Sequence, residues 1–388
     1  MTQGAPGTVT AHLKMTVLSA TVAAAAAAAA AGASYAYVDL SLHRMGASAT
    51  AIGLNAAMPA LAWLLTTPLM PTLLRRFDPG AVLRALLVVA MLSPLGFVLS
   101  ADQDVWMALR FLFGGSLGMV FRLTEYWISA ASPDDRRGFN VGLYASAFCA
   151  GAAVGAALVP LTGTEGWPTI LLIQALVGVA LVMLTVAKAA PPRITGAPRI
   201  SLAKLSASVA VMTALIFGLF ESVPYTLMPV YAVTAGLSED WAAGTVSAFL
   251  IGALLFPIPV GALADRVGKP GVLAACGVAG LAVPLILPAT LDVPQALMAA
   301  MLVWGGAAGS LYTVALAMLA DRFRGVDLAA ANVAFGTLYA FGALVGPLLH
   351  GMAMDWHPPQ GLMESSFLLF LVYLSTMFWS FRRMGSRP

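Results

Sequence analysis

Two stretches of the sequence place acidic side chains inside long apolar runs. In the first, Arg122 and Glu125 stand three residues apart, so they share one face if the run is helical. Glu125 can then act as a proton carrier or a cation ligand with Arg122 as its partner, or the two can form a static ion pair. Burial and the neighbouring arginine act on the carboxylate in opposite senses, so its charge state stays open.

The second carboxylate, Glu221, lies three residues before Pro224. Because proline has no amide hydrogen, Pro224 leaves the carbonyl of Phe220 without its helical donor and favours a break in a helix. A carboxylate beside a broken membrane helix is well placed to bind an amine or to exchange a proton. The alternative is a side chain that caps the kink or lies near the membrane interface.

The amino-acid composition indicates a membrane protein, in which a charged residue within an apolar run is a candidate for function. Of the 388 residues, 60% are hydrophobic and 10% are charged, whereas soluble domains carry about 25% charged residues. The chain is therefore predicted to lie in a lipid bilayer, where a charge near the centre costs about 2.5–3.5 kcal/mol. The two cysteines and four histidines match neither a disulfide scaffold nor a metal site, so no cofactor or metal is expected. The basic residues form short, separated clusters, which indicate no nucleic-acid partner.

The elements that position these side chains are twelve apolar runs, each close to the ~20 residues that a membrane helix needs. Strands of a membrane barrel would need only about 10 residues, so we predict an all-α membrane protein. The nine alanines Ala23–Ala31 also fit a signal peptide, whose removal would leave eleven spans. The twelve runs cover residues 14–40, 50–74, 81–100, 105–130, 139–161, 168–188, 203–231, 241–262, 271–290, 294–320, 328–352 and 365–382.

The placement of lysine and arginine predicts the orientation of the chain. With a cytoplasmic N-terminus, 17 of the 20 Lys and Arg residues fall in inner segments and only Arg44 falls in an outer loop. Positive residues favour the cytoplasmic side, so both termini are expected there. For a bacterial protein this means the inner (plasma) membrane.

An internal repeat divides the twelve runs into two sets of six. Residues 1–188 are predicted to form an N-terminal half, 189–203 a cytoplasmic central loop, and 204–388 a C-terminal half. Several residues recur at one offset of 187 positions, which are Asp134 with Asp321, Arg137 with Arg324, Gly155 with Gly342 and Pro160 with Pro347. Two six-helix halves are typical of transporters that rock around a site at the membrane midplane, so the fold class is twelve transmembrane helices in two pseudo-symmetric six-helix halves.

Residues 261–269 read Gly-Ala-Leu-Ala-Asp-Arg-Val-Gly-Lys. This segment, predicted to be a loop, resembles the cytoplasmic signature Gly-x-Leu-x-Asp-Arg-x-Gly-Arg/Lys of the major facilitator superfamily. The segment between the second and third runs keeps Arg76 but has Pro71 and Arg75 where the signature has Gly and Asp. With the twelve runs and the repeat, the chain is identified as a member of this superfamily, which implies a monomer.

A narrower resemblance lies in the fourth run. Residues 125–127 read Glu-Tyr-Trp, which is similar to a bacterial branch of the superfamily with Glu-x-Trp in its fourth helix. The antiporter signature of the fifth helix is absent in its full form, and residues 342–347 of the eleventh run are nearer to it. The direction of transport therefore stays open on this criterion.

The resemblance also implies which side chains carry function, because helices one, four, seven and ten line the cavity in this superfamily. For each single aromatic, ordinary helix packing is the alternative. The implied substrate- or proton-coupling residues are Arg122, Glu125, Tyr126, Trp127, Glu221, Tyr225, Trp304 and Tyr312.

A second set of residues is predicted to gate the cavity. Asp265 and Arg266 can pair with neighbouring helix ends and close the inner side, while Arg110 can pair with Asp39 near the outer side. Anchoring of arginines at the inner surface is the alternative reading of the basic members. The gating set is Asp39, Arg76, Arg110, Arg137, Asp265, Arg266, Lys269 and Arg324.

The expected function is secondary active transport with alternating access, driven by protons. No phosphate-binding loop occurs in the sequence, and no catalytic His/Asp/Ser set is visible, so we expect no enzyme. The apolar and aromatic lining with two acids favours a small amphipathic or weakly cationic solute, exported as in a proton antiporter. The alternative within this class is proton-coupled uptake of a small organic acid or amino-acid-like nutrient, with Arg122 as the carboxylate anchor. A membrane enzyme or a sensor without flux is the alternative from another class.

Overall fold

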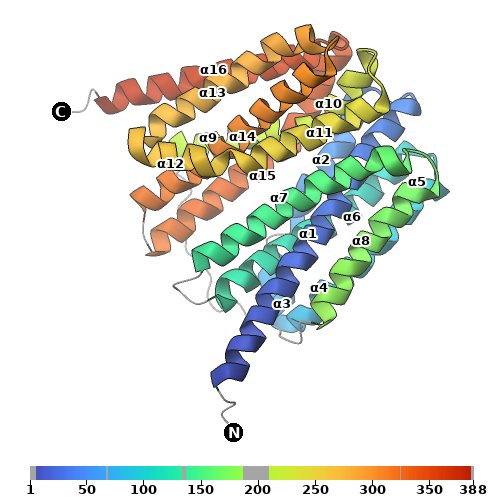
Figure 1. Cartoon of the computed structure of the whole chain (residues 1–388), viewed down its shortest axis with the longest axis vertical. Helices are drawn as coiled ribbons and strands as arrows, with labels where there is room; N and C mark the ends of the chain where they lie inside the picture. Colours follow the sequence, from blue (N-terminus) through green and yellow to red (C-terminus); the bar gives the residue numbers. More distant parts are fainter. Residues whose placement is uncertain (1–5, 67–68, 133–136, 187–208, 324, 386–388) are drawn as a thin grey trace. The chain divides into compact units, whose positions relative to one another are not determined.

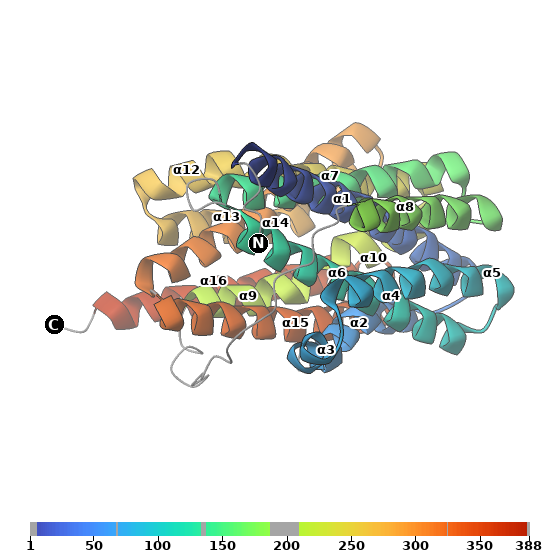
Figure 2. The same ribbon diagram turned by 90° about the horizontal axis from the view of Figure 1, so that it is seen from below.

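The computed structural model describes residues 6–66, 69–132, 137–186, 209–323 and 325–385 (Figures 1 and 2). Every regular element within these ranges is a helix. The first nine elements are α1 (Pro6–Arg44), α2 (Ala49–Thr66), α3 (Met70–Arg76), α4 (Pro79–Leu92), the short 3₁₀ helix η2 (Ser93–Leu95), α5 (Gly96–Leu99), α6 (Gln103–Ala131), α7 (Arg137–Thr162) and α8 (Trp167–Val186). The others are α9 (Val209–Glu221), α10 (Val223–Thr234), α11 (Glu239–Leu255), α12 (Pro257–Val267), α13 (Lys269–Ile286), the 3₁₀ helix η4 (Leu287–Thr290), α14 (Pro294–Arg322), α15 (Gly325–Trp356) and α16 (Gly361–Gly385).

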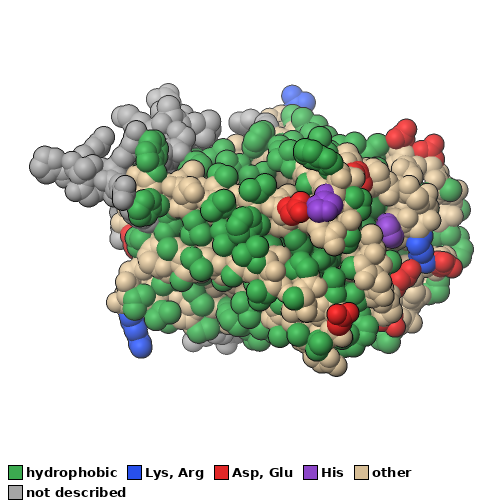
Figure 3. Space-filling view, turned by 90° about the horizontal axis from the view of Figure 1, so that it is seen from above, with side chains coloured by type: hydrophobic (Ala, Val, Ile, Leu, Met, Phe, Trp, Pro, Cys, Tyr) green, Lys and Arg blue, Asp and Glu red, His purple; other side chains and the backbone are tan. Residues whose placement is uncertain are grey.

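The number of membrane spans agrees with the sequence. The described residues contain eleven helical segments long and apolar enough to cross a membrane, and the bent pair α11–α12 brings the number to twelve. Hydrophobic side chains are spread across the face shown in Figure 3, with few charged side chains among them. Large hydrophobic side chains such as Leu161, Leu99 and Ile258 are exposed. An apolar outer surface of this kind is what lipid tails require. The all-α membrane fold is therefore confirmed.

Prolines lie at the breaks in two of the predicted spans described next. The run predicted over 50–74 is α2 followed by α3, which has Pro71 in its first turn, the helical position that tolerates proline. The run over 241–262 bends by 41° between α11 and α12, where Pro257 and Pro259 remove two amide donors. The segment predicted as a loop over 261–269 is helical as far as Val267, and it turns only at Gly268, whose φ of 99° favours glycine.

The described residues pack as two compact units. One unit falls within residues 1–38 and 61–195, and the other within 39–60 and 196–388. The end of α1 and the first part of α2 therefore pack with the second unit, although they come early in the chain. The predicted division into 1–188 and 204–388 follows the order of the spans and stays a prediction, and the central loop 189–203 lies outside the described residues.

Glycines let the helices of each unit approach closely. In the first unit, a β-carbon added to Gly155 of α7 would lie 1.9 Å from the carbonyl oxygen of Ala29 in α1. In the second unit, a β-carbon on Gly342 of α15 would lie 2.5 Å from the carbonyl oxygen of Leu215 in α9. The alanine-rich α1 is thus a thin helix that packs backbone to backbone. The repeat pair Gly155 and Gly342 makes the same kind of contact in both units.

We expect Gly155→Ala to destabilise the protein, because a backbone carbonyl cannot rotate away from the added methyl group. Overpacking of this kind costs about 1–3 kcal/mol. Gly178→Ala in α8 is the matched control, since no atom lies within 4 Å of the added carbon. Thermal unfolding of the purified protein in detergent measures both, and equal midpoints would contradict the close α1–α7 contact.

Candidate functional site

Glu221 lies at a break within the seventh span. Helix α9 ends at Glu221 and α10 begins at Val223, with Pro224 in the first turn of α10. The expected break at Pro224 is therefore present, and the amides of Tyr225 and Thr226 both bond to the carbonyl of Ser222. The carboxylate is half-buried at the end of an otherwise buried helix. It must be stabilised by groups of the neighbouring helices.

Two tyrosine hydroxyls donate hydrogen bonds to the carboxylate. Tyr225 Oη lies 3.5 Å from Glu221 Oε1, and Tyr339 of α15 donates to Oε2. Each carboxylate oxygen can accept more than one hydrogen bond, so acceptor capacity remains for a proton or a cationic ligand. Gly218 explains how Tyr339 reaches this position, because a β-carbon there would lie 2.1 Å from the carbonyl oxygen of Tyr339.

Further aromatic rings pack against Tyr339, one of the two tyrosines that donate to this carboxylate. The Phe217 ring lies 5.2 Å from that of Tyr312 and 5.8 Å from that of Tyr339 between centroids. Tyr312 in turn lies 5.2 Å from Phe335 and 6.3 Å from Tyr339. Ring faces and a carboxylate together form a site that can hold an organic cation. We call Phe217, Glu221, Tyr225, Tyr312 and Tyr339 the Glu221 cluster.

Trp304, predicted beside Tyr312 on α14, packs elsewhere. Its side chain is 1% exposed, its Nε1 donates to the carbonyl of Gly280 at 3.3 Å, and its ring lies 4.7 Å from Phe220. Eight residues of helix correspond to about 80° of rotation, so the two aromatics contact different neighbours. Only Tyr312 joins the Glu221 cluster.

The Arg122–Glu125 pair belongs to the first unit. The Arg122 guanidinium lies 5.7 Å from the centre of the Trp63 ring, and its charge attracts the Glu125 carboxylate. Glu125 is exposed and Arg122 is half-buried, whereas Trp127 is 3% exposed and packs in the core of the unit. The side chain of Tyr126 lies outside the described part of the structure. Arg122 and Glu125 are therefore close enough to interact electrostatically on α6, as their spacing in the sequence predicts.

Arg110 and Asp39 are both buried, with exposures of 1% and 0%. The Arg110 guanidinium lies 5.0 Å from the centre of the Tyr35 ring, a cation–π contact between α6 and α1. The predicted pairing of Arg110 with Asp39 stays a prediction.

Lys269, the first residue of α13, links three helices of the second unit. Its Nζ lies 3.1 Å from Asp265 Oδ1 of α12 and 2.8 Å from Asp321 Oδ2 of α14. Arg266 and Arg76 are exposed. Arg324 and the side chain of Arg137 lie outside the described residues. Among the predicted gating residues described here, Lys269 and Asp265 thus form the ion pair that ties helix ends together.

The sequence did not single out Tyr339. The tyrosine lies in a long apolar helix, and no spacing in its own span relates it to Glu221, which is 118 positions away. The signal that was present is the pair of close-packing glycines, Gly218 and Gly342, which bring α9 and α15 together. Within the described residues, no group of three or more His, Cys, Asp or Glu is arranged to hold a metal ion.

A sequence profile of the Major Facilitator Superfamily matches residues 15–248 and 241–387. The chain belongs to this superfamily. YfkF of Bacillus subtilis (strain 168), an uncharacterised transporter of this type, is 29% identical over 320 residues, which are 80% of this chain and 81% of that protein. YcaD of Escherichia fergusonii, also an uncharacterised transporter of the superfamily, is 26% identical over 285 residues, or 70% of each chain. The protein is thus a multi-pass membrane transporter, which carries a small-molecule cargo.

Solved structures share the fold. The nucleoside transporter NupG superposes with a TM-score of 0.76 at 12% identity, over 96% of this chain and 100% of that one. A D-xylose–proton symporter superposes with a TM-score of 0.75 at 16% identity, over 95% and 97% of the two chains. At such identities the likeness concerns the fold, and cargo has to be argued from the side chains.

We expect Lys269→Gln to destabilise the protein slightly, because it removes both ion pairs at once. The two aspartates are largely exposed, so the loss is about 1 kcal/mol or less. Arg266→Gln is the matched control, three residues earlier on an exposed side chain. Thermal unfolding at low and high salt measures the difference, which should shrink as salt screens the charges. A difference that does not depend on salt would contradict an electrostatic role.

Proposed function

We propose that this transporter exchanges protons for a small amphipathic or weakly cationic organic solute and exports that solute from the cell. It acts as a monomer by alternating access, in the inner membrane of a bacterium, with both termini in the cytoplasm. The orientation is supported by the excess of lysine and arginine in the inner segments. The substrate class is supported by the Glu221 cluster.

The single observation that carries the proposal is the environment of Glu221. The carboxylate accepts hydrogen bonds from Tyr225 and Tyr339, and the Tyr339 ring lies 5.8 Å from that of Phe217 and 6.3 Å from that of Tyr312. An ammonium group gains from the carboxylate by charge and from the rings by cation–π attraction, which is worth about 0.5–2 kcal/mol per contact. A sugar or another neutral polyol would instead need several amide partners.

Proton coupling follows from competition for the same carboxylate. Glu221 can be neutralised either by a proton or by a bound cation, and a buried carboxylate without either is costly. If each event favours a different conformation of the transporter, the binding energies of proton and solute are linked. The proton gradient then drives release of the solute on the outer side.

The second candidate, uptake of an organic acid, depends on Arg122. The guanidinium lies against Trp63 and can present its planar donors to a carboxylate. The nearby Glu125 competes for the same charge, which weakens this site for anions. We therefore do not assign solute binding to Arg122 and Glu125. In the proposed mechanism, a second proton that binds Glu125 neutralises its carboxylate and ends its attraction to Arg122.

We expect Glu221→Gln to abolish coupling, because an amide can accept hydrogen bonds but cannot bind a proton or neutralise a cation. The wild-type chain and the variant are placed in liposomes with an internal pH dye, and pools of amines and their neutral analogues are added. Solute-triggered proton movement should fall about tenfold or more, which corresponds to about 1.4 kcal/mol. Glu364→Gln, an exposed glutamate of α16, is the control. Unchanged proton movement in Glu221→Gln would refute the proposal.

Arg122→Gln separates the two candidates. If the solute is a cation bound at Glu221, the variant keeps cation-triggered flux within about threefold of wild type, since the substitution removes a repelling charge and no ligand. If the solute is an organic acid held by Arg122, anion uptake falls about tenfold or more, because charged pairs are strong contacts. Radiolabelled uptake and efflux assays in the same liposomes measure both, and full anion uptake in Arg122→Gln excludes the second candidate.

A further inference from the structure

Trp63 of α2 lies in a groove that glycines of α6 leave open. Its Nε1 donates a hydrogen bond to the carbonyl oxygen of Gly114 at 3.0 Å. A β-carbon on Gly118 would lie 1.5 Å from that nitrogen, and one on Gly115 would lie 2.6 Å from Cβ of Ala62, the residue before Trp63. The missing side chains and the hydrogen bond together fix the position of the indole on α6.

The Arg122 guanidinium lies over this indole, and both residues belong to the first unit. The distance from its central carbon to the ring centre is 5.7 Å, close to the limit of about 6 Å for a cation–π contact. In the same unit, the Arg110 guanidinium approaches the Tyr35 ring to 5.0 Å. The Arg122 contact is therefore the looser of the two, and the guanidinium has room to move closer to its ring.

A carboxylate attracts the same guanidinium. Glu125 follows Arg122 by three residues, so the two side chains share a face of α6, and the charge of Arg122 acts on the carboxylate. The other titratable group that interacts with Glu125 in the described part of the chain is Tyr144 of α7, whose hydroxyl donates to the carbonyl oxygen of Phe121 at 2.9 Å. The indole and the carboxylate thus compete for one cation.

The remaining helices beside α6 bring no second cation to Glu125 among the described side chains. α2 has no charged residue, and Arg84 of α4 lies 3.9 Å from Asp78 at the start of its own helix. The described charged side chains of α1 lie beyond Tyr35, which contacts Arg110, about four turns of α6 away from Glu125. Arg122 is therefore the cation that decides the electrostatic environment of this carboxylate.

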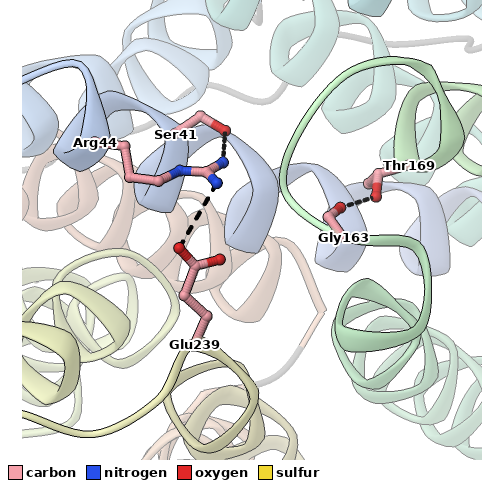
Figure 4. A network of polar contacts seen from close by, with 5 residues as sticks. All are labelled: Ser41, Arg44, Gly163, Thr169 and Glu239. Atoms are coloured by element: carbon pink, nitrogen blue, oxygen red, sulfur yellow. Dashed lines mark hydrogen bonds and ion pairs between the residues drawn. The ribbon is translucent and has the colours of Figure 1, made fainter.

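An arginine at the end of a helix has another choice, as Arg44 of the second unit shows (Figure 4). Its Nη1 lies 3.7 Å from Glu239 Oε1, and its Nη2 donates to Ser41 Oγ at 3.4 Å. Both charged side chains are partly exposed, at 31% and 41%, so water can replace these partners. Arg122 instead lies within the apolar segment Gln103–Glu125, where a charge without a partner is costly.

We infer that Trp63 is a positioning residue for proton binding at Glu125, because its ring stabilises the Arg122 cation when the carboxylate becomes neutral. While Glu125 is charged, the guanidinium is shared between the carboxylate and the indole. After a proton binds, the attraction to the carboxylate ends and the guanidinium moves onto the ring. Trp63 thereby favours the protonated form of Glu125. The inference rests on the proposed function in one respect, namely that Glu125 binds the second proton of the cycle.

The experiment measures protonation of Glu125 without any solute. Dicyclohexylcarbodiimide reacts with carboxyl groups in their protonated form, so its rate of reaction at Glu125, followed by mass spectrometry of the modified peptide, falls as the pH rises. Trp63→Leu removes the ring and should lower the pH midpoint of this reaction by about 0.5–1 pH unit, the equivalent of one cation–π contact. Trp63→Phe keeps a weaker ring and should give a smaller change in the same direction, and it tests the inference alone if Trp63→Leu does not fold.

Arg122→Gln provides the control for a merely structural effect. Without the guanidinium there is no cation for the indole to stabilise, so adding Trp63→Leu to Arg122→Gln should leave the midpoint at Glu125 unchanged. Glu221 of the second unit is followed in the same samples, and Trp63→Leu should leave its labelling profile unchanged.

A lower midpoint in Trp63→Leu that disappears in the Arg122→Gln background supports the inference. An unchanged or higher midpoint, an equal change in both backgrounds, or labelling of Glu125 that does not depend on pH overturns it. Because labelling needs no solute, failure of the proposed function is recognised separately. If Glu221→Gln keeps its coupling while the Glu125 midpoint still responds to Trp63→Leu, the proton–cation exchange is wrong and the role of Trp63 stands. If Glu221→Gln loses its coupling and the Glu125 midpoint does not respond, the role of Trp63 is wrong and the exchange stands.

Discussion

The structure depends on how one carboxylate is held among apolar helices. Glu221 ends α9 within a membrane span, where no water is available to solvate it as in bulk solution. Its partners therefore have to come from the protein, and they come from two other helices, through Tyr225 of α10 and Tyr339 of α15. Tyr225 reaches the carboxylate across the helix break at Pro224, one turn on in the chain.

Close packing by glycine sets the geometry of those partners. Gly218 lies one turn before Glu221 and allows the backbone of Tyr339 to approach α9, and Gly342 and Gly346 continue the same contact along α15. A larger residue at any of these positions would push α15 outward and lengthen the hydrogen bond to Glu221. The distance between α9 and α15 thus determines whether the Tyr339 hydroxyl can reach the Glu221 carboxylate.

Much of this could be predicted from the chain, and the reasons for the exceptions are physical. Hydropathy and charge placement predict the spans because the bilayer imposes a length and a polarity on each helix. Glu221 and its break are visible because a charge and a proline are both rare inside such runs. Tyr339 and Asp355 are not, since each acts on a partner more than 100 positions away. Trp304 shows the opposite case. It was predicted among the substrate- or proton-coupling residues, but its side chain is buried in the core.

The two ends of the second unit are held differently from its middle. Between α9 and α15 the backbones touch through Gly218, Gly342 and Gly346, which leaves no room for water in this contact. At the ends, the contacts involve charges that are partly exposed. These are the ion pairs of Lys269 with Asp265 and Asp321, and the Asp355 carboxylate, which accepts from the amides of Ala49 and Thr50 at the start of α2. Ion pairs of this kind weaken as water or salt screens their charges. Each contributes only about 1 kcal/mol or less, so the binding free energy of a proton or a cation is large enough to break one. The proposed transport cycle needs both kinds of contact, because the close-packed helices keep the Glu221 cluster intact while the weaker ion pairs and caps at the helix ends can break as each side opens in turn.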